Sequence, residues 1–308
     1  MSPLHQALAD YLAVRRAMGF KLDRAEKLLG QFVSYLDERG AATVTVEHAL
    51  AWATAPRAAS AWWWAMRMSA VRGFAGYLHT VDPHVEVPPA GIIAYRRQRA
   101  TPFLYSAADV HALVEAATGL PRPTSAVTYP ALVSVLAVTG MRLGEAIGLD
   151  TSDFDEDAGT LTVRDGKFGK ARLLPLHPTT TKGIRQYLRR RSGLHRTHVS
   201  DALFISTAGT RLDHSCVQKT FRRLTRQAGL HPRSAACRPR IHDLRHSFAV
   251  ATLLDWYRQG QDVPALMPRL SAYLGHTDPK HTFWYLSAAP ELLTLAGHRL
   301  HTYLDSRP

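Results

Sequence analysis

A histidine and a tyrosine lie close together near the end of the sequence, in the stretch LSAYLGHTDPKHTFWYL at residues 270–286. His276 ends an apolar run with helical spacing, and Tyr285 follows nine residues later. A phenol has a pKa of ~10 and is a weak nucleophile until a base removes its proton. This tyrosine can therefore attack an electrophile only if other residues activate the phenol and stabilise the charge that develops.

Arg142 and Glu145 form a second candidate group. Arg142 follows an apolar helical run over residues 129–139, and a new helix is predicted to begin near Leu143. An arginine at such a junction can pack its stem while its guanidinium binds an anion through two parallel hydrogen bonds. Glu145 follows at the i,i+3 spacing, from which a carboxylate can orient that guanidinium. Most pairs of this kind are ion pairs on a helix surface, so the pair alone does not define a site.

His242 and Arg245 form a third group, at the start of another apolar helix. Their i,i+3 spacing places both side chains on the same side of that helix. Free backbone N–H groups and the partial positive charge of a helix N-terminus favour a bound anion there. His246 is predicted to point elsewhere and to pack or to cap the helix. A histidine and an arginine that converge on a helix start predict phosphate binding.

Two strand-like runs, residues 160–165 and 171–176, flank the segment GKFGK at residues 166–170. The pattern predicts a β-hairpin with a glycine-containing connection. Lys167 and Lys170 at its tip could reach a groove or a phosphate, although lysine is also common at exposed turns.

The positive charge is concentrated in the C-terminal two-thirds of the chain. The net charge is +13 with a pI near 10.1. Residues 1–95 hold nine Lys and Arg against eight Asp and Glu, whereas residues 96–308 hold twenty-nine against seventeen. This distribution favours a folded nucleic-acid-binding surface in the second part. The further candidate DNA contacts are Arg96, Arg97, Arg99, Lys170, Arg222 and Arg226.

Several function classes find no support in the composition. There is no apolar run long enough to cross a membrane, no acidic cluster for a metal pair and no Gly-x-x-x-x-Gly-Lys-Ser/Thr loop for a nucleotide. Cys216 and Cys237 are too few for a zinc or disulfide framework and fit a reducing cytosol. Neither a metal nor a cofactor is therefore expected.

Helix signals and prolines predict the domain organisation. Residues 1–82 are predicted to form a helical DNA-binding domain, in which Thr45 and Ser60 cap two helices. The Pro-punctuated residues 83–104 are predicted to be a linker, and residues 105–308 the second domain. Three basic residues are expected on the surface of the first domain: Arg57, Arg67 and Arg72.

Three segments of the second domain carry further predictions. Ser106 and Asp109 have the spacing of a capping box at a helix start. Residues 203–206, LFIS, are predicted to be a buried strand. Residues 289–301 are predicted to form an amphipathic C-terminal helix, which packs on its own domain or docks on a neighbouring subunit.

Together these groups resemble the active-site motifs of the tyrosine recombinases, also called phage-type integrases. The motifs occur in the family's order and at its approximate spacing: TGMRLGE at 139–145, GKFGK at 166–170, HDLRH at 242–246, LGH at 274–276 and TFWY at 282–285. One departure is Leu286-Ser287 after the tyrosine, where many relatives have Thr-His. These two positions take no part in the bond chemistry, so the catalytic assignment is unaffected.

The resemblance implies a mainly α fold with a small antiparallel β-sheet. A helical SAM-like core-binding domain would be followed by a tyrosine-recombinase catalytic domain of the DNA breaking-rejoining fold. Glu145 would support the six active-site positions, which would be Arg142, Lys167, His242, Arg245, His276 and Tyr285.

The chemistry that the resemblance implies explains why each of these residue types is needed. Two arginines and His276 can clamp the charge on the non-bridging oxygens of a phosphodiester without a metal. Tyr285 would attack, His242 would remove its proton, and Lys167 would protonate the leaving 5′-oxygen. The resulting 3′-phosphotyrosyl bond conserves the energy of the cleaved linkage, so resealing needs no ATP.

The implied function is that of a site-specific recombinase or integrase, encoded by a transposon or integrative element and acting in the bacterial cytoplasm on nucleoid DNA. The implied partner is double-stranded DNA with an inverted-repeat core site. Monomers would assemble into a tetramer on two such sites, with or without companion recombinases.

Three alternatives remain open. A type IB topoisomerase relaxes supercoils with similar tyrosine chemistry, a non-catalytic relative binds DNA only, and a Xer-like resolvase separates chromosome dimers. The complete set of catalytic residue types argues against a pure binder, because binding needs neither a nucleophile nor a leaving-group acid. The sequence TFWYLSAAPELL from residue 282 favours a mobile element over a housekeeping resolvase.

Overall fold

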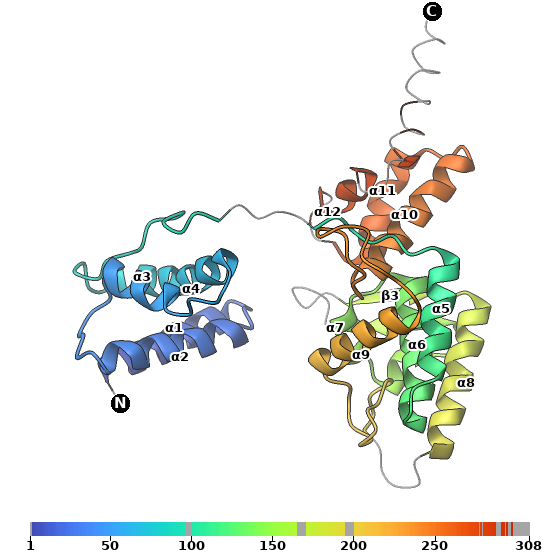
Figure 1. The fold of residues 1–308 in the computed structure, drawn as a ribbon, viewed down its shortest axis with the longest axis horizontal. Helices are drawn as coiled ribbons and strands as arrows, with labels where there is room; N and C mark the ends of the chain where they lie inside the picture. The colour runs from blue at the N-terminus through green and yellow to red at the C-terminus, as the bar shows by residue number, and fades with distance from the viewer. Residues whose placement is uncertain are drawn as a thin grey trace, which may run out of the picture. The chain divides into compact units, whose positions relative to one another are not determined.

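The computed structural model of the chain describes residues 2–95, 100–164, 171–194, 200–276, 278, 280–287, 291, 292, 294 and 297. The chain divides into two compact units, Met1–Arg99 and Ala100–Pro308. Both units are built mainly from helices, and the second also contains a small sheet (Figure 1). The predicted fold class, mainly α with a small antiparallel sheet, is therefore confirmed.

The first unit is a helical bundle around its own core. Its helices are α1 (Pro3–Ala17), α2 (Asp23–Asp37), α3 (Val46–Thr54) and α4 (Ala61–His79). Apolar residues at helical spacing face inward, and Leu29, Phe32 and Leu36 of α2 are fully buried. Thr45 and Ser60 cap α3 and α4, because each side-chain oxygen accepts a hydrogen bond from a backbone N–H of the first turn. Both predicted caps are confirmed.

Arg67 of α4 is buried, contrary to the prediction that it lies on the surface. Its guanidinium donates to the Trp52 carbonyl at 2.7 Å and lies 3.6 Å over the Trp52 ring. The indole face attracts the cation, and the carbonyl in the last turn of α3 carries a partial negative charge. Both interactions stabilise the guanidinium inside the protein. Arg67 therefore supports the bundle, whereas Arg57 is exposed and Arg72 is half-buried.

Parts of the segment between α4 and the second unit pack against the folded units. Val85 is buried in the core of the first unit, and the Glu86 carboxylate accepts a hydrogen bond from the first residue of α3. Phe103 is buried in the core of the second unit. The expected linker, residues 83–104, is thus divided between the two units. Its basic residues lie outside the described part of the chain: Arg96, Arg97 and Arg99.

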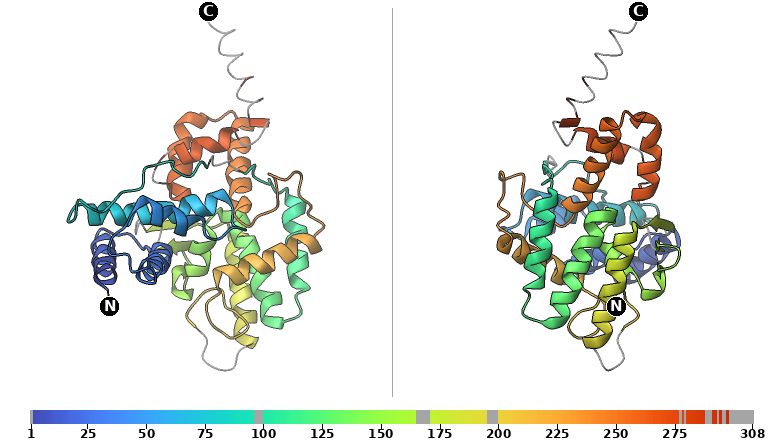
Figure 2. Two further views of the ribbon diagram at one scale, coloured as in Figure 1. Left: turned by 60° about the vertical axis from the view of Figure 1, so that its left-hand side comes forward. Right: turned by 90° about the vertical axis from the view of Figure 1, so that its right-hand side faces the viewer.

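The second unit is built around α6. The helices in its first part are α5 (Ala107–Thr118), α6 (Pro123–Thr139), α7 (Leu143–Gly148), the short 3-10 helix η1 (Thr151–Asp153), α8 (Pro178–Leu194) and α9 (His214–Gln227). Those in its last part are α10 (Asp243–Arg258), α11 (Val263–Leu274), α12 (Lys280–Phe283) and the 3-10 helix η3 (Trp284–Ser287). Helices α5, α6 and α8 lie side by side in two views (Figures 1 and 2). The predicted capping box of Ser106 and Asp109 begins α5.

A three-stranded antiparallel sheet completes the second unit. Its strands are β1 (Phe154–Asp155), β2 (Thr160–Val163) and β3 (Arg172–Pro175), in that order across the sheet. Leu161 of β2 pairs with Leu174 of β3, and both are fully buried. The predicted antiparallel pairing of the two runs is confirmed, whereas the hairpin tip with Lys167 and Lys170 lies outside the described residues.

Residues 203–206 do not form the predicted strand. Leu203, Phe204 and Ile205 are buried as expected, but the segment makes only isolated bridges, such as that between Ile205 and Arg211. A short apolar run predicts burial equally well in a strand or in an irregular segment. The burial was therefore predictable and the pairing was not.

Two glycines allow the ends of α6 and α11 to come close to other elements. Gly140 and Gly275 follow these helices with φ angles of 59° and 67°, in the left-handed region that favours glycine. A Cβ at Gly140 would lie 2.5 Å from the Phe248 ring, and one at Gly275 would lie 2.7 Å from the Arg172 guanidinium. Glycine thus meets both a backbone and a space requirement at each helix end. The predicted catalytic residues that the structure describes lie around these two ends.

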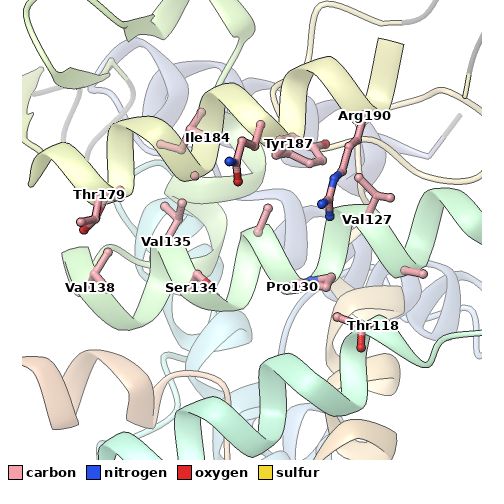
Figure 3. Close-up of a pocket in the computed structure, with 15 residues that line it drawn as sticks. Thr118, Val127, Pro130, Ser134, Val135, Val138, Thr179, Ile184, Tyr187 and Arg190 are labelled. Carbon is pink, nitrogen blue, oxygen red and sulfur yellow. The ribbon is translucent and has the colours of Figure 1, made fainter. Parts of the chain in front are cut away.

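A groove of about 360 Å³ lies between α6 and α8 (Figure 3). Its walls are mainly apolar, and Arg190 of α8 points across it toward α6. Its described lining residues include none of the predicted catalytic residues. In the part of the chain that the structure describes, no helix has the length and apolar character needed to cross a membrane.

Candidate active site

Five of the six predicted catalytic residues are described, and all five lie at helix ends or in short helical turns. Arg142 directly precedes α7, His242 directly precedes α10, and Arg245 is in the first turn of α10. His276 follows the end of α11, and Tyr285 is in η3. Lys167 lies outside the described residues. The contacts described below connect these segments, which are far apart in the sequence.

Arg245 is deeply buried, with only 2 % of its surface exposed. Its guanidinium donates to the Gly140 carbonyl at 2.9 Å and to the Leu274 carbonyl at 2.6 Å, and it lies 2.8 Å from His276 Nε2. Both carbonyls belong to helix C-termini, where carbonyls lack intrahelical partners and carry partial negative charge. Burial lowers the pKa of Arg245, while Tyr285 opposes this shift through its charge and a side-chain hydrogen bond. The ends of α6 and α11 thus hold a charged guanidinium inside the protein.

Arg142 is held beside the same helix ends but keeps part of its surface accessible. One of its guanidinium nitrogens donates to the Gly275 carbonyl at 3.1 Å, and another donates to Glu145 at 2.7 Å. Its side chain is 28 % exposed, whereas that of Glu145 is 5 % exposed. An arginine fixed by a buried carboxylate with one open side can receive an anion without rearranging. The i,i+3 pair suggested by the sequence therefore forms in a partly buried setting.

Arg172 is a residue of this site that the sequence analysis missed. It lies on β3 and bonds both Glu145 oxygens, at 3.2 and 2.8 Å, while its Nε donates to the Tyr273 carbonyl at 2.9 Å. Its side chain is only 12 % exposed. The available signal was strand alternation, because Arg172 shares a face with the buried Leu174 two residues on. A charged residue on the inward face of a strand predicts a buried partner of opposite charge.

Glu145 joins the two arginines through one carboxylate. Desolvation by burial raises the pKa of this carboxyl, but hydrogen bonds from Arg172 and Arg142 outweigh that effect and lower the pKa to about 2. Glu145 is therefore ionised at every pH at which the protein is expected to work. The carboxylate offsets the repulsion between two guanidinium groups that face the same site.

This depressed pKa makes a prediction about stability. Glu145 stabilises the fold fully above its ordinary value of 4.5, and this contribution is lost as the pH falls toward 2. At pH 7 the contribution is on the order of 3 kcal/mol. Urea unfolding of Glu145→Gln should show a deficit of this size at pH 7 that shrinks below pH 4.5. The matched control is Glu156→Gln, whose exposed partner is Arg185 and which should lose less than about 1 kcal/mol. Equal losses of unfolding free energy for the two variants would contradict the stabilising role of the Glu145 carboxylate.

His242, which is exposed, and His246, which is half-buried, form a pair of neutral imidazoles next to the arginines. Their rings meet edge to face with centroids 5.0 Å apart. Desolvation of its ring by the surrounding protein lowers the pKa of His242 to about 4, with the charges of Arg245 and Arg142 adding to the effect. Burial, with the charge of His242 and nearby arginines, lowers the pKa of His246 to about 3. His242 is therefore unprotonated near neutral pH and able to accept a proton.

Tyr285 is buried against the other rings of the site, with 2 % of its surface exposed. Ring centroids of His246, Trp284 and His276 lie 5.3, 5.9 and 6.0 Å from its own. Tyr285 therefore lies beside the arginines and histidines of its own chain. Its ring contacts His246, which in turn contacts His242. The prediction that His246 points away from the site is therefore wrong, because its ring lies against both the phenol and the expected base.

The candidate DNA contacts are only partly described. Arg222 and Arg226 lie on the exposed face of α9, one helical turn apart, as their spacing predicts. Lys170 and the basic residues before residue 100 lie outside the described part of the chain. Within the described residues, no group of three or more His, Cys, Asp and Glu side chains could hold a metal ion.

The fold and the site are those of a class of proteins in which a tyrosine can attack a phosphodiester. Cationic side chains then stabilise the negative charge that develops on the phosphate. The profile of the "Phage integrase family" matches residues 105–291, and the chain belongs to this family. It is a tyrosine-type, site-specific DNA recombinase.

Individual relatives agree with this membership. A Sinorhizobium fredii protein named as an integrase/recombinase, y4rB, is 42 % identical over 316 residues, which covers 100 % of both chains. The tyrosine recombinase XerC of Vibrio campbellii is 31 % identical over 189 residues, which covers 61 % of this chain and 57 % of XerC. The Tn1549 transposon integrase, solved in complex with transposon right-end DNA, has a TM-score of 0.63 at 14 % identity, with 96 % of this chain and 98 % of the other covered. This last likeness concerns the fold alone.

Proposed function

We propose that the chain cleaves and rejoins DNA through a covalent 3′-phosphotyrosyl bond to Tyr285. The observation that carries this proposal is the placement of Arg142 and Arg245. Carbonyls at the ends of α6 and α11 hold both guanidinium groups, and Tyr285 is packed beside them. A scissile phosphate bound by the two arginines would therefore lie within reach of the phenol.

Charge stabilisation is the first role that we propose. Attack on a phosphodiester spreads negative charge over its non-bridging oxygens, and fixed donors aimed at those oxygens lower the barrier. Arg142 has an open side for such an oxygen, and Arg245 can redirect a donor from its present acceptors. His276, hydrogen-bonded to Arg245, would complete the clamp. Neither a metal ion nor ATP enters this scheme.

Proton transfer is the second role. His242 is neutral near pH 7 and would accept the phenolic proton, directly or through the phosphate. His246, whose ring lies against both His242 and Tyr285, would hold the phenol in place. Lys167 would protonate the leaving 5′-oxygen, as the family resemblance implies.

The proposed partner is double-stranded DNA with an inverted-repeat core site. Solved relatives include a lambda integrase dimer bound to a COC′ core site and a lambda integrase tetramer bound to a Holliday junction. We propose the same kind of assembly for this chain, from monomers that meet on two DNA sites, with or without companion recombinases. The basic residues on α9 and before residue 100 would contact the DNA backbone. The DNA-binding unit would be residues 1–82, and residues 105–308 would form the catalytic domain.

A mobile element is the favoured biological setting. The whole-length similarity to an integrase/recombinase is higher than the partial similarity to XerC. We therefore propose that the chain moves a transposon or integrative element in the bacterial cytoplasm, and we retain chromosome-dimer resolution as the second candidate.

The test begins with footprinting of the full-length protein on the ends of the DNA element that encodes it. Two copies of the protected site are then placed on one supercoiled plasmid. We expect recombinant products only when both sites are present. Relaxation of a plasmid that lacks the sites would indicate a topoisomerase. A footprint without any strand cleavage would indicate a pure DNA-binding protein, and activity confined to chromosome-terminus sites would indicate a resolvase.

A further inference from the structure

His276 is hydrogen-bonded at both of its ring nitrogens. Nε2 lies 2.8 Å from a guanidinium nitrogen of Arg245, and Nδ1 lies 2.7 Å from the Thr282 hydroxyl. The Thr282 hydroxyl donates in turn to the Ser271 hydroxyl at 3.1 Å. Thr282 is 1 % exposed and Ser271 is 6 % exposed. A buried chain of hydrogen bonds therefore runs from a proposed clamp arginine, through His276, to α12 and α11.

The chemistry of the groups fixes the direction of each bond in this chain. A guanidinium has only donors, so Nε2 must accept from Arg245. A neutral imidazole carries one N–H, which then lies on Nδ1 and donates to the Thr282 oxygen. The Thr282 hydroxyl has its own proton left to donate to Ser271, which agrees with the geometry of that bond. In the DNA-free chain, His276 is thus the Nδ1–H tautomer.

The surroundings of His276 keep it neutral in this state. Burial lowers its pKa to about 3, and the charges of Arg245, Arg142, His281 and Arg172 act in the same direction. Arg245 faces His276 from α10, and Arg142 from the residue before α7. His281 lies on α12, and Arg172 lies on β3. Protonation to an imidazolium is therefore unfavourable near pH 7 as long as no anion is bound.

This tautomer is the wrong one for the proposed transition-state role. To donate to a non-bridging phosphate oxygen beside Arg245, His276 needs its proton on Nε2. Nδ1 must then accept a hydrogen bond, and its partner must donate. A threonine hydroxyl can accept in the first state and donate in the second, and the Ser271 hydroxyl can reverse with it. Valine at this position could do neither.

We propose that Thr282 is a positioning residue for DNA cleavage, whose hydroxyl can bond either His276 tautomer and reverses its hydrogen bond when a phosphate binds. The Nδ1 proton passes to the Thr282 oxygen as the Thr282 proton passes to Ser271 and the Ser271 proton passes to water. A water molecule returns one proton to Nε2, so the protons balance and the ring stays neutral. Arg245 would turn a donor to the phosphate at the same time and free Nε2. This inference rests on the proposed function, because it assigns the purpose of the switch to phosphodiester attack.

Two variants separate this role from simple packing. Thr282→Val keeps the branched shape and removes the hydroxyl, whereas Thr282→Ser keeps the hydroxyl and loses a methyl group. We expect Thr282→Val to form covalent complex on a nicked suicide substrate about 10- to 100-fold more slowly, the range found when a metal-binding histidine loses its outer hydrogen-bond partner. Thr282→Ser should recover most of the rate, and both should bind DNA like the unchanged protein. Ser271→Ala should have a smaller effect, because Thr282 keeps its bond to His276.

Two outcomes of this experiment would overturn the proposal. One is a Thr282→Val variant that cleaves as fast as the unchanged protein. The other is a Thr282→Ser variant that is impaired as strongly as Thr282→Val, since shape and not the hydroxyl would then matter.

A spectroscopic measurement tests the same proposal without relying on variants of Thr282. In ¹⁵N-histidine NMR spectra of the full-length protein, the His276 signal is assigned by its loss in His276→Gln. We expect Nδ1–H in the free protein and Nε2–H in the DNA complex of Tyr285→Phe. Nε2–H in the free protein, or no change on DNA binding, would overturn the proposal. The free-protein tautomer does not depend on cleavage, so failure here is distinguishable from failure of the proposed function, which would appear as absence of any covalent complex.

Discussion

Tyr285→Phe is expected to bind its DNA site normally and to form no covalent complex with it. The phenyl ring preserves the packing against His246, His276 and Trp284, so the site should remain folded. Only the phenolic oxygen, which is the proposed nucleophile, is removed. Electrophoresis under denaturing conditions after incubation with a nicked suicide substrate measures the covalent product directly.

The matched control for this prediction is Tyr273→Phe. Tyr273 lies in the same unit and packs near the site against Phe248, but its hydroxyl has no role in the proposed chemistry. This control should form covalent complex at nearly the rate of the unchanged protein, and both variants should keep DNA affinities within about threefold, because phosphate contacts by other residues dominate binding. If Tyr285→Phe still became attached to DNA, the nucleophile would have to be another residue.

Loss of Arg245 is expected to have the second-largest effect on the rate of covalent-complex formation. Removing one preorganised donor from a charge-stabilising site typically lowers the rate by about 10²- to 10³-fold. Arg245→Ala would also leave the Gly140 and Leu274 carbonyls without their buried donors, so part of its effect would be loss of stability. Arg245→Lys retains the charge but lacks the planar fork that reaches several acceptors at once. We expect its covalent-complex formation to fall by about 100-fold.

Single-turnover cleavage at saturating protein measures the loss of charge stabilisation, and thermal unfolding measures the loss of protein stability. Arg142→Lys serves as the comparison, because Arg142 is more exposed and its loss should disturb the fold less. A fully folded Arg245→Lys variant that cleaves at the unchanged rate would contradict the proposed clamp.

Local sequence signals predicted much of the fold. The caps at Thr45, Ser60 and Ser106 form because each depends on a side chain and a backbone N–H within three residues. The contact of Arg142 with Glu145 has the same origin, since it spans a single helical turn. Spacing along one helix can be read from sequence because helix geometry determines which residues are neighbours.

Contacts between distant segments could not be predicted in this way. Arg172 meets Glu145 across 27 residues and the Tyr273 carbonyl across 101 residues, so only the folded chain reveals its partners. Arg67 appeared exposed by its charge, but an indole ring and a carbonyl from α3 make its burial favourable. The two helix C-termini that hold Arg245 are likewise brought together only by the tertiary fold.

Carbonyl oxygens at helix ends explain how this site can hold several cations before DNA binds. Arg142, Arg172 and Arg245 would repel one another in an apolar pocket. Glu145 neutralises part of their charge, and the carbonyls of Gly140, Leu274 and Gly275 supply the rest as fixed dipoles. An incoming phosphate would replace some of these acceptors, so binding and alignment would occur in one step.

The most direct test of this account is to identify the residue that becomes linked to DNA. The full-length protein is trapped on a nicked suicide substrate, digested with nuclease and trypsin, and analysed by mass spectrometry. We predict a nucleotide remnant on the peptide of residues 281–299, with fragment ions that place it on Tyr285. A remnant on any other peptide, such as residues 270–280 with Tyr273, would contradict the account.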